Sequence, residues 1–372
     1  MILLLVNYLK NFYHVPLVFE SYSFRMSLGA LTSLLVTIFY GKVFIKKLYE
    51  LKIGQTIRKE ECPILGELHR KKEDTPTMGG VLILFSMLVS LLLWMDLTQP
   101  FTIILALTTL FLGILGGIDD YLKLKHRNSK GLSGRKKMIA QITFSLLLAF
   151  YLLGPFSAQY GSFMSWLYIP FIKGPLIHFT GFYVIFLALL WLLVVCGSSN
   201  AVNLTDGLDG LAAGSLIMVA SCLAVIAFVS NHFQISKYLN ILYLEGSGEI
   251  AIYLSALVGG CLGFLWYNSH PAQVFMGDTG SLPLGGIIGV SSILLRRELL
   301  LVIIGGIFVA EALSVILQVG SYKLRNKKRI FRCAPLHHHF EYIGWPETKV
   351  VHRFWIIGFL LSVIGIISIK FQ

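Results

Sequence analysis

Two adjacent carboxylates, Asp119 and Asp120, stand between an apolar stretch and a basic loop. Neighbouring acids repel each other, so a cation or several hydrogen bonds must stabilise them where water is scarce. Mg²⁺ suits such a pair because it prefers one or two carboxylates together with phosphate oxygens and water. The pair therefore indicates metal-assisted chemistry on a phosphate. A helix end with solvated acids is the simpler alternative.

A second polar group recurs every three residues, at Asn200, Asn203, Asp206 and Asp209. On a helix, this spacing predicts a single polar stripe. Acids and amides at the start of a membrane span are too costly to face lipid, so the stripe is expected to serve a function. A polar helix cap is the alternative.

A third group, from Asn268 to Ser281, precedes another apolar stretch. Within it, Asp278 lies in a tight turn flanked by glycines, a position suited to binding a metal. Phe275, three residues earlier, could stack on a flat base, although an aromatic side chain near a membrane surface is more often an anchor.

Further candidates carry donors for phosphates. His337, His338 and His339 are consecutive, and helical neighbours point about 100° apart, so one or two imidazoles are expected to face a site. There they would donate to a phosphate or hold a proton near neutral pH. Zinc is a competing interpretation, but no cysteine pair or spaced histidine supports it.

Lys72 and Thr75 precede an apolar stretch and could offer donors near a helix N-terminus.

The elements that must position these residues are membrane helices. The 372 residues are 56% hydrophobic and 13% charged, whereas soluble domains carry about 25% charged residues. The mean hydropathy is +0.75, and a helix needs about 20 apolar residues to cross a bilayer core. We predict an all-α polytopic membrane protein, one integral-membrane domain over 1–372, with about ten transmembrane helices, at 25–46, 78–96, 101–118, 138–154, 176–196, 208–230, 249–267, 281–295, 299–322 and 353–371.

The N-terminal segment 1–24 is apolar but is interrupted by polar residues and Pro16. It lacks a clean cleavage site, so it is predicted to lie at the membrane interface rather than to act as a signal peptide. The five cysteines are scattered without a CxxC pair, which supports neither a disulfide framework nor a zinc knuckle.

Basic charge orients the predicted bundle. The net charge of +12 would suggest a nucleic-acid partner in a soluble protein, but 23 of the 31 Lys and Arg residues lie in three loops, 46–72, 123–137 and 323–353. The positive-inside rule makes these loops cytoplasmic and both termini periplasmic, so no nucleic-acid partner is expected. Topology signalling alone would explain most individual lysines. The polar groups described above fall on the same cytoplasmic face, which predicts an active site there.

Acids for Mg²⁺, together with lysines and histidines for phosphates, imply phosphoryl transfer, a reaction that depends largely on positioning and charge neutralisation. Because the face is reachable from both cytosol and lipid, one substrate would be a soluble nucleotide-activated compound and the other a lipid phosphate.

The chain resembles the bacterial phospho-N-acetylmuramoyl-pentapeptide transferases from about residue 25 to the C-terminus, with motifs in the same order. The motifs are Thr75-Pro-Thr-Met-Gly-Gly80, Asp119-Asp-Tyr121, Asn203-Leu-Thr-Asp-Gly-Leu-Asp209-Gly, Phe275-Met-Gly-Asp278-Thr-Gly-Ser281 and Ala334-Pro-Leu-His-His-His339-Phe-Glu341. The resemblance implies a ten-helix inner-membrane enzyme of peptidoglycan synthesis, often a homodimer. Such enzymes transfer phospho-MurNAc-pentapeptide from UDP-MurNAc-pentapeptide to undecaprenyl phosphate, releasing UMP and forming lipid I in the lipid bilayer.

The resemblance also implies roles. Asp278 matches the Mg²⁺ ligand, and Asp119 the acid that deprotonates or orients the lipid phosphate, with Asp120 beside it. The residues that match positions for the UDP part are Lys72, Thr75, Asn203, Asp206, Asp209, Asn268 and Phe275, with Phe275 under the uracil. His337, His338 and His339 match a histidine triplet near the phosphates, and Lys137 matches a basic position after the acidic pair.

Small departures from the family pattern remove no ligand. Asp74 stands where the family usually has Gly, and Pro283 stands where Ala is common. Proline is tolerated early in a helix.

Three alternatives remain open. The sister enzymes that transfer GlcNAc-1-phosphate to a polyprenyl phosphate share the acidic motifs but not the histidine and Thr-Pro-Thr motifs. A transporter would place polar residues at mid-span, where Glu311, Ser314 and Gln318 are the main examples. A structural scaffold would need none of the motifs.

Overall fold

The computed structural model describes residues 2, 6, 8, 16–51, 75–126, 131–154 and 162–370. This part of the chain is almost entirely helical, and its elements are η1 (Leu17–Glu20), α2 (Tyr22–Glu50), α4 (Gly80–Trp94), α5 (Pro100–His126), α6 (Gly134–Leu153), η4 (Ser162–Ser165), β1 (Trp166–Tyr168), β2 (Pro175–His178), η5 (Gly181–Tyr183), α7 (Val184–Thr205), α8 (Leu211–Ser230), α9 (Phe233–Leu239), α10 (Ser247–Asn268), α11 (Asp278–Leu294), α12 (Glu298–Ile304), α13 (Gly306–Leu324), α14 (Leu336–Tyr342) and α15 (Glu347–Lys370).

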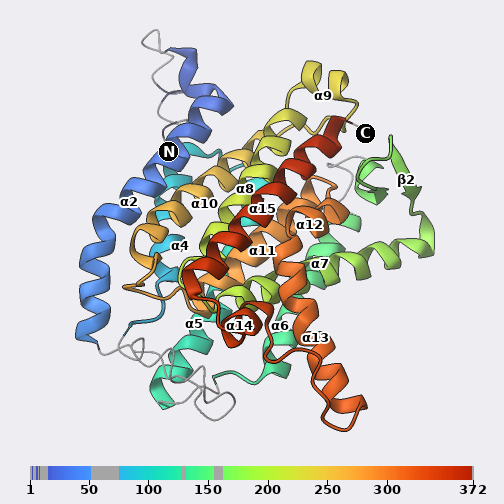
Figure 1. The fold of residues 1–372 in the computed structure, drawn as a ribbon. Coiled ribbons are helices and arrows are strands. Elements are labelled where there is room, and N and C mark those ends of the chain that lie inside the picture. Colours follow the sequence, from blue (N-terminus) through green and yellow to red (C-terminus); the bar gives the residue numbers. More distant parts are fainter. Residues whose placement is uncertain are drawn as a thin grey trace.

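The bundle is built around α11, in which all 17 residues are buried. This helix packs mainly against α5 and α7, while α10 packs against α2 and α8 (Figure 1). A helix that is apolar all round can be buried completely. Because the neighbouring helices cover α11 on all sides, its polar N-terminus lies against protein and not against lipid.

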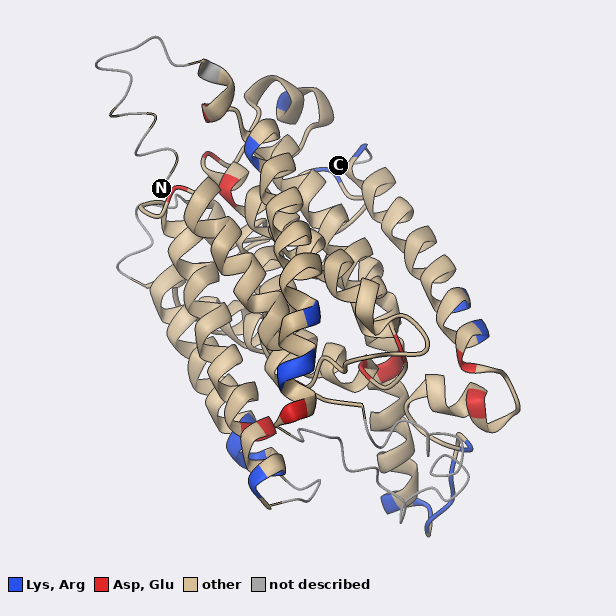
Figure 2. Cartoon of the chain, turned by 90° about the vertical axis from the view of Figure 1, so that its left-hand side faces the viewer, with Lys and Arg blue, Asp and Glu red and all other residues tan. Residues whose placement is uncertain are grey.

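The membrane-protein prediction is confirmed in its coarse form. Eight helices in the described part of the chain are long and apolar enough to cross a membrane, and α4 is a shorter apolar helix. Figure 2 shows that the long helices are uncharged over most of their length. The count of ten spans stays a prediction, as does the interfacial role of 1–24, of which half lies outside the described residues.

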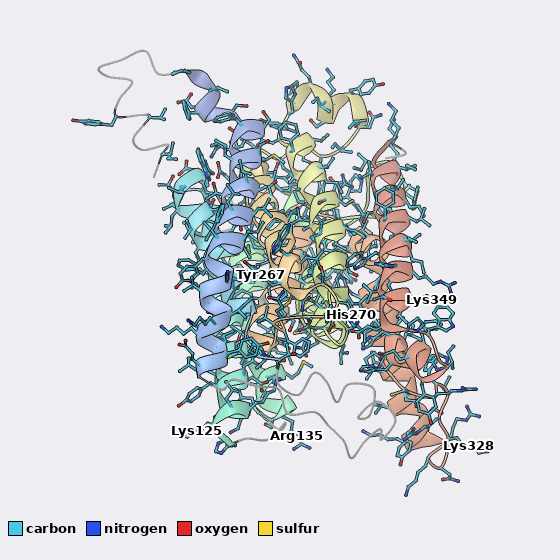
Figure 3. The ribbon with its side chains drawn as sticks, turned by 60° about the vertical axis from the view of Figure 1, so that its left-hand side comes forward. Lys125, Arg135, Tyr267, His270, Lys328 and Lys349 are labelled. Carbon is cyan, nitrogen blue, oxygen red and sulfur yellow. The ribbon has the colours of Figure 1, made fainter. Side chains whose placement is uncertain are left out.

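The two ends of the bundle differ in charge. Figure 3 shows Lys125, Arg135 and Lys328 at one end, the end at which Figure 1 shows α14. At the opposite end, Tyr22 at the start of α2 lies against α10, and Lys370 at the end of α15 lies over the ring of Tyr238 in α9. The first long helix therefore begins at the end of the bundle where the last one ends. That both termini are periplasmic stays a prediction. Which end faces the cytoplasm stays a prediction.

The predicted span 176–196 is displaced along the chain. The structure has a short antiparallel hairpin there, β1 paired with β2, and α7 begins only at Val184 and continues to Thr205. The glycines at 174 and 181 have positive φ angles, which a helix does not accommodate. Because α7 ends at Thr205, the predicted stripe from Asn200 to Asp209 is divided between the helix and the turn that follows it.

The predicted span 299–322 is divided at Gly305 into α12 and α13. Two consecutive glycines at 305 and 306 give the chain the freedom to change direction at this point. The remaining expected spans coincide with helices, although α5 extends eight residues beyond its predicted end at 118, so the acidic pair lies inside a helix.

The contact between α5 and α11 is close enough to require a glycine. A Cβ atom on Gly116 would lie 2.1 Å from the backbone oxygen of Asp278. Gly116→Ala is therefore expected to destabilise the protein by about 1–3 kcal/mol, because the backbone of α11 must shift. Thermal unfolding in detergent measures the effect. Gly117→Ala is the control, since its Cβ would meet only Thr279 at 3.9 Å; equal unfolding midpoints for both variants would contradict the prediction.

Candidate active site

Helix α5 presents two acids and a lysine on its last turns. Asp119 and Asp120 are fully buried or nearly so, at 0% and 2% exposed. Lys123 follows Asp119 by four residues and Asp120 by three, spacings that bring helical side chains together. The helix thus supplies a cation for its own acids.

Asp119 is held on both of its oxygens. Its Oδ2 lies 2.6 Å from Nζ of Lys123 and 3.0 Å from Nζ of Lys137 on α6. Its Oδ1 accepts a hydrogen bond of 2.7 Å from the backbone N–H of Leu132, in the segment before α6. Asp119 therefore joins α5 to α6.

Asp120 instead joins α5 to α11. Its Oδ2 accepts hydrogen bonds from the backbone N–H and the hydroxyl of Thr279, at 2.9 and 2.7 Å. Thr279 is the second residue of α11, where backbone N–H groups have no partner within the helix. A carboxylate at this position satisfies one of these groups and interacts favourably with the helix dipole.

Asp278, the first residue of α11, completes the cluster. Its Oδ2 lies 2.6 Å from Nζ of Lys137 and 3.2 Å from Nζ of Lys123, and its Oδ1 accepts a hydrogen bond of 2.8 Å from Asn203. Burial opposes its charge, but a hydrogen bond with Asp119 and the charges of Lys123 and Lys137 hold the pKa of Asp278 well below its ordinary value. The carboxylate is thus charged and bound to two cations.

The same three acids can hold a metal ion. One oxygen from each of Asp119, Asp120 and Asp278 lies within 4.8 Å of the others. Three hard oxygen donors with no sulfur or imidazole among them fit Mg²⁺. The predicted convergence of the acidic pair with Asp278 is therefore found in the geometry, although the identity of a metal stays a prediction.

Asp206 lies at the end of α7, close to this cluster. Desolvation raises the pKa of Asp206 to about 7, and the charges of Asp278 and Asp120 act in the same direction, despite a hydrogen bond from the backbone of Gly277. A fourth acid therefore changes its charge near neutral pH, as expected where several carboxylates share a small volume.

Asp209 and Asn268 hold backbone groups of the surrounding segments. Asp209 Oδ2 accepts a hydrogen bond from the backbone N–H of Ala272 at 3.1 Å and lies 3.0 Å from Nδ1 of His270. Asn268 accepts from Gly210 N–H at 2.9 Å and donates to Val274 at 2.8 Å. These two residues fix the turn after α7 against the segment that leads to α11.

A second group of possible metal ligands adjoins this turn. Asp209, His270 and Glu347 bring ligand atoms within 4.8 Å of one another, and Glu347 also accepts a hydrogen bond of 2.8 Å from Asp209 N–H. His270 and Glu347 line a surface pocket of about 370 Å³. Figure 3 shows His270 nearer the middle of the molecule than Lys125 or Lys328.

Phe275 and Thr75 lie on two segments that run side by side. Phe275 N–H donates to Pro76, and its carbonyl accepts from Gly79, both at 2.8 Å. Thr75 is buried, whereas Phe275 is only half-buried. The predicted nucleotide residues Thr75 and Phe275 are therefore neighbours, while Lys72 lies outside the described residues.

The three histidines have different partners. His337 is 1% exposed and lies 3.2 Å from Glu311 on α13. His338 lies 2.8 Å from Glu341, and Nδ1 of His339 accepts a hydrogen bond of 3.2 Å from the backbone N–H of Arg332. No direct contact joins them to the carboxylate cluster among the described residues.

Several site residues were missed in the sequence. Lys123 contacts all three acids, and Ser281 accepts a hydrogen bond of 2.8 Å from Asn203. The spacing of Lys123 from the acidic pair was a usable signal, because four residues is one helical turn. The partners of Ser281 and Glu347 lie far away in the chain, and no local pattern marked them.

Known proteins resemble this chain along its whole length. The model for glycosyl transferase family 4 matches residues 102–296, and phospho-N-acetylmuramoyl-pentapeptide-transferase signature 1 matches residues 72–84. A phospho-N-acetylmuramoyl-pentapeptide-transferase of Protochlamydia amoebophila (strain UWE25) is 60% identical, with both chains covered completely. The same-named proteins of Endomicrobium trichonymphae and Francisella philomiragia subsp. philomiragia are 48% and 47% identical, over 95% and 100% of each chain.

The lysine that bridges the three acids provides a test of their electrostatics. Lys123→Met is expected to lower the thermal midpoint without divalent metal at pH 7, because one lysine remains for three buried carboxylates. A carboxyl with a depressed pKa contributes its full stability above the pKa of the unfolded chain, about 3.9, and loses it as the pH falls through the lower pKa of the folded state. The deficit is therefore expected in full from pH 7 down to about pH 5 and to shrink only below about pH 4. Lys125→Met, at an exposed position, is the control, and a deficit that does not change with pH would contradict the account.

Proposed function

The chain belongs to the phospho-N-acetylmuramoyl-pentapeptide-transferase family, and from this membership we propose how its carboxylate cluster carries out the family's reaction. The chain is a membrane transferase of peptidoglycan synthesis that forms lipid I. In the proposed reaction, phospho-MurNAc-pentapeptide passes from UDP-MurNAc-pentapeptide to undecaprenyl phosphate. An oxygen of the lipid phosphate forms the new bond to phosphorus, the bond to the uridylate oxygen breaks, and UMP leaves.

The observation that carries this proposal is the meeting of three acids and two lysines at one end of an apolar bundle. Asp119, Asp120 and Asp278 lie within ion-pair distance of Lys123, and Lys137 contacts Asp119 and Asp278. Phosphoryl transfer between two anionic substrates requires positive charge and oriented groups more than covalent chemistry. This cluster supplies both at one end of a membrane bundle.

We propose that Asp278 is the Mg²⁺ ligand, with oxygens of Asp119 and Asp120 within reach. When bound, Mg²⁺ would neutralise charge on the pyrophosphate and on the departing UMP. Lys123 and Lys137 would bind phosphate oxygens, since their flexible stems allow the ammonium groups to move from carboxylate to phosphate.

The acids next to each other on α5 are proposed to have different roles. Asp119 would orient the lipid phosphate or accept its proton. Asp120 would hold α11 in place, because both of its strong hydrogen bonds go to Thr279. The roles follow from their main partners. Asp119 is bound by two lysines and by the backbone N–H of Leu132, whereas Asp120 is bound chiefly to a helix N-terminus.

The nucleotide is proposed to bind between the turn after α7 and the paired segments at Thr75 and Phe275. Phe275 would stack on the uracil, and Asn203 and Asp206 would bind polar groups of the UDP part together with Lys72 and Thr75. Asp209 and Asn268 would contribute by fixing the shape of this turn, because they already hold backbone groups. The proposed phosphate partners from the histidine triplet are His337, His338 and His339.

The setting of the enzyme is part of the proposal. The basic end of the bundle (Figure 3) would face the cytoplasm, where the soluble nucleotide is available. The chain would lie in the inner membrane as a homodimer. The sister activity, transfer of GlcNAc-1-phosphate, is the alternative outcome of the first experiment below.

The first experiment is the release of UMP by detergent-purified protein, with undecaprenyl phosphate and UDP-MurNAc-pentapeptide, with and without Mg²⁺. Wild-type protein is expected to release UMP only with Mg²⁺. Asp278→Asn is expected to lower the rate by more than about a hundredfold, because the amide keeps the shape but loses the charge that binds the metal.

Two controls make this result specific. UDP-GlcNAc replaces the muramoyl nucleotide in a parallel reaction, and release with UDP-GlcNAc alone would move the chain to the sister activity. The thermal midpoint of the variant shows whether it folds. Near-normal turnover by Asp278→Asn would remove Asp278 from the metal role.

Stacking by Phe275 can be tested separately. Phe275→Ala is expected to raise KM for UDP-MurNAc-pentapeptide about tenfold and to leave KM for the lipid unchanged, since base stacking contributes about 1–3 kcal/mol. Phe182→Ala, at an exposed position beside the far end of α7, is the control. Equal changes in both KM values would argue against stacking.

A further inference from the structure

One buried acid has no role in the reaction as proposed so far. Glu311 lies in α13, an apolar helix long enough to cross a membrane, and is 0% exposed. An ionisable side chain in such a helix is costly unless a partner compensates its charge. The group that compensates the charge of Glu311 therefore indicates the role of this side chain.

The partner is His337. Glu311 Oε1 accepts a hydrogen bond of 3.1 Å from the backbone N–H of His337 and lies 3.2 Å from Nδ1 of its ring. His337 is itself only 1% exposed. Among the described residues, Glu311 Oε2 and both ring nitrogens of His337 have no hydrogen-bond partner, and the ion pair found for either side chain joins Glu311 to His337.

The far side of the imidazole faces the substrate region. A Cβ atom on Gly207 would lie 2.3 Å from Nε2 of His337, so the ring lies directly against the turn that begins at Asp206. Glu311, His337 and this turn belong to three separate parts of the chain. The imidazole therefore links the buried acid of α13 to the turn that is proposed to bind the nucleotide.

We propose that Glu311 is a positioning residue for His337: its carboxylate keeps the proton on Nδ1 and directs Nε2 toward the turn that carries Asp206. An anionic acceptor on one imidazole nitrogen fixes the tautomer and the orientation of the ring. The inference rests on the proposed function, because it assigns the orientation of a histidine that acts in that reaction.

The neighbouring ionisable groups do not take the place of Glu311. The ring of His338 lies 4.2 Å from that of His337, centroid to centroid, but its Nδ1 lies 2.8 Å from Glu341. On α15, which also packs against α14, Lys349 and Arg353 lie over the ring of Trp345. His338 with Glu341 thus forms a separate pair that serves as an internal control.

The first test is steady-state kinetics of Glu311→Gln. The amide can still accept the hydrogen bond from the backbone but carries no charge. We expect kcat to fall about tenfold to a hundredfold, as for other partners of functional histidines, with both KM values within about twofold of wild type. Glu311→Asp is expected to recover part of kcat. Ser314→Ala, which removes a buried hydroxyl bonded to the Glu311 carbonyl on the same helix, is expected to leave kcat unchanged.

A double-mutant cycle decides whether the two residues act together. If Glu311 acts through His337, adding Glu311→Gln to His337→Gln is expected to lower kcat no further. Full activity of Glu311→Gln, or losses that multiply in the double variant, would overturn the proposal. A loss of kcat that only follows a lower thermal midpoint, without recovery in Glu311→Asp, would reduce Glu311 to a structural residue and also overturn it.

The tautomer can be read without turnover. In protein labelled with ¹⁵N-histidine, the ring signals of His337 are those missing from His337→Gln. We expect one protonated Nδ1 in the wild type and a mixture of tautomers in Glu311→Gln, with the His338 signals unchanged. An unchanged His337 spectrum would overturn the proposal.

This measurement separates the proposal from the proposed function. A wild-type protein that releases no UMP would refute the proposed function, while the spectra would still show whether Glu311 sets the His337 tautomer. If Glu311→Gln does not fold, Glu311→Asp provides a second comparison, because its shorter carboxylate is expected to keep the proton on Nδ1 only in part; an unchanged His337 spectrum would again overturn the proposal.

Discussion

The structure depends on a constraint of charge: three carboxylates share one end of an apolar bundle, and two lysines must lie among them. Lys123 comes from the helix that carries two of the acids, and Lys137 comes from α6. Without these cations, mutual repulsion and desolvation would favour protonated acids. Because Asp119 and Asp278 bind both lysines, the ends of α5, α6 and α11 must stay together. The arrangement of these helices is therefore coupled to the electrostatics of the site.

The same coupling explains why the backbone of α11 approaches α5 so closely. Asp120 binds the N-terminus of α11, and Gly116, one helical turn earlier, leaves no side chain between the two helices. Both contacts place Asp278 at the acidic pair rather than at the membrane surface. A larger residue at 116 would displace Asp278 from the acidic pair, so the packing of the two helices and the geometry of the carboxylate cluster both require glycine there.

The sequence predicted the helical membrane fold and the meeting of the acids, because long apolar runs and paired carboxylates are local patterns. Its predictions failed where distant partners decide the outcome. Helix α7 continues past residue 196, and there Asn200 donates a hydrogen bond of 2.7 Å to Gln141 of α6, a partner that no hydropathy pattern contains. In the sequence, Lys123 could not be told apart from the other basic residues of the loop 123–137, which the positive-inside rule explains without any role in a site. The direction of His337 likewise depends on Glu311, on another helix.

The carboxylate cluster differs from the other buried acids of the bundle in the type of basic residue that pairs with it. Two other buried acids pair with arginine: Glu249 with Arg25 at 2.8 Å, and Glu298 with Arg296. Those guanidinium groups also donate hydrogen bonds to the backbone carbonyls of Trp94 and Trp166. Each arginine side chain is therefore held by more than one partner. At the carboxylate cluster the cations are lysines, whose compact charge and flexible stem allow a change of partner. A permanent link between helices favours arginine, whereas a site whose anions must give up their cations to a substrate favours lysine. On this physical criterion, the lysines at the acidic end of α5 are suited to a change of partner, whereas the arginine pairs are suited to hold helices together.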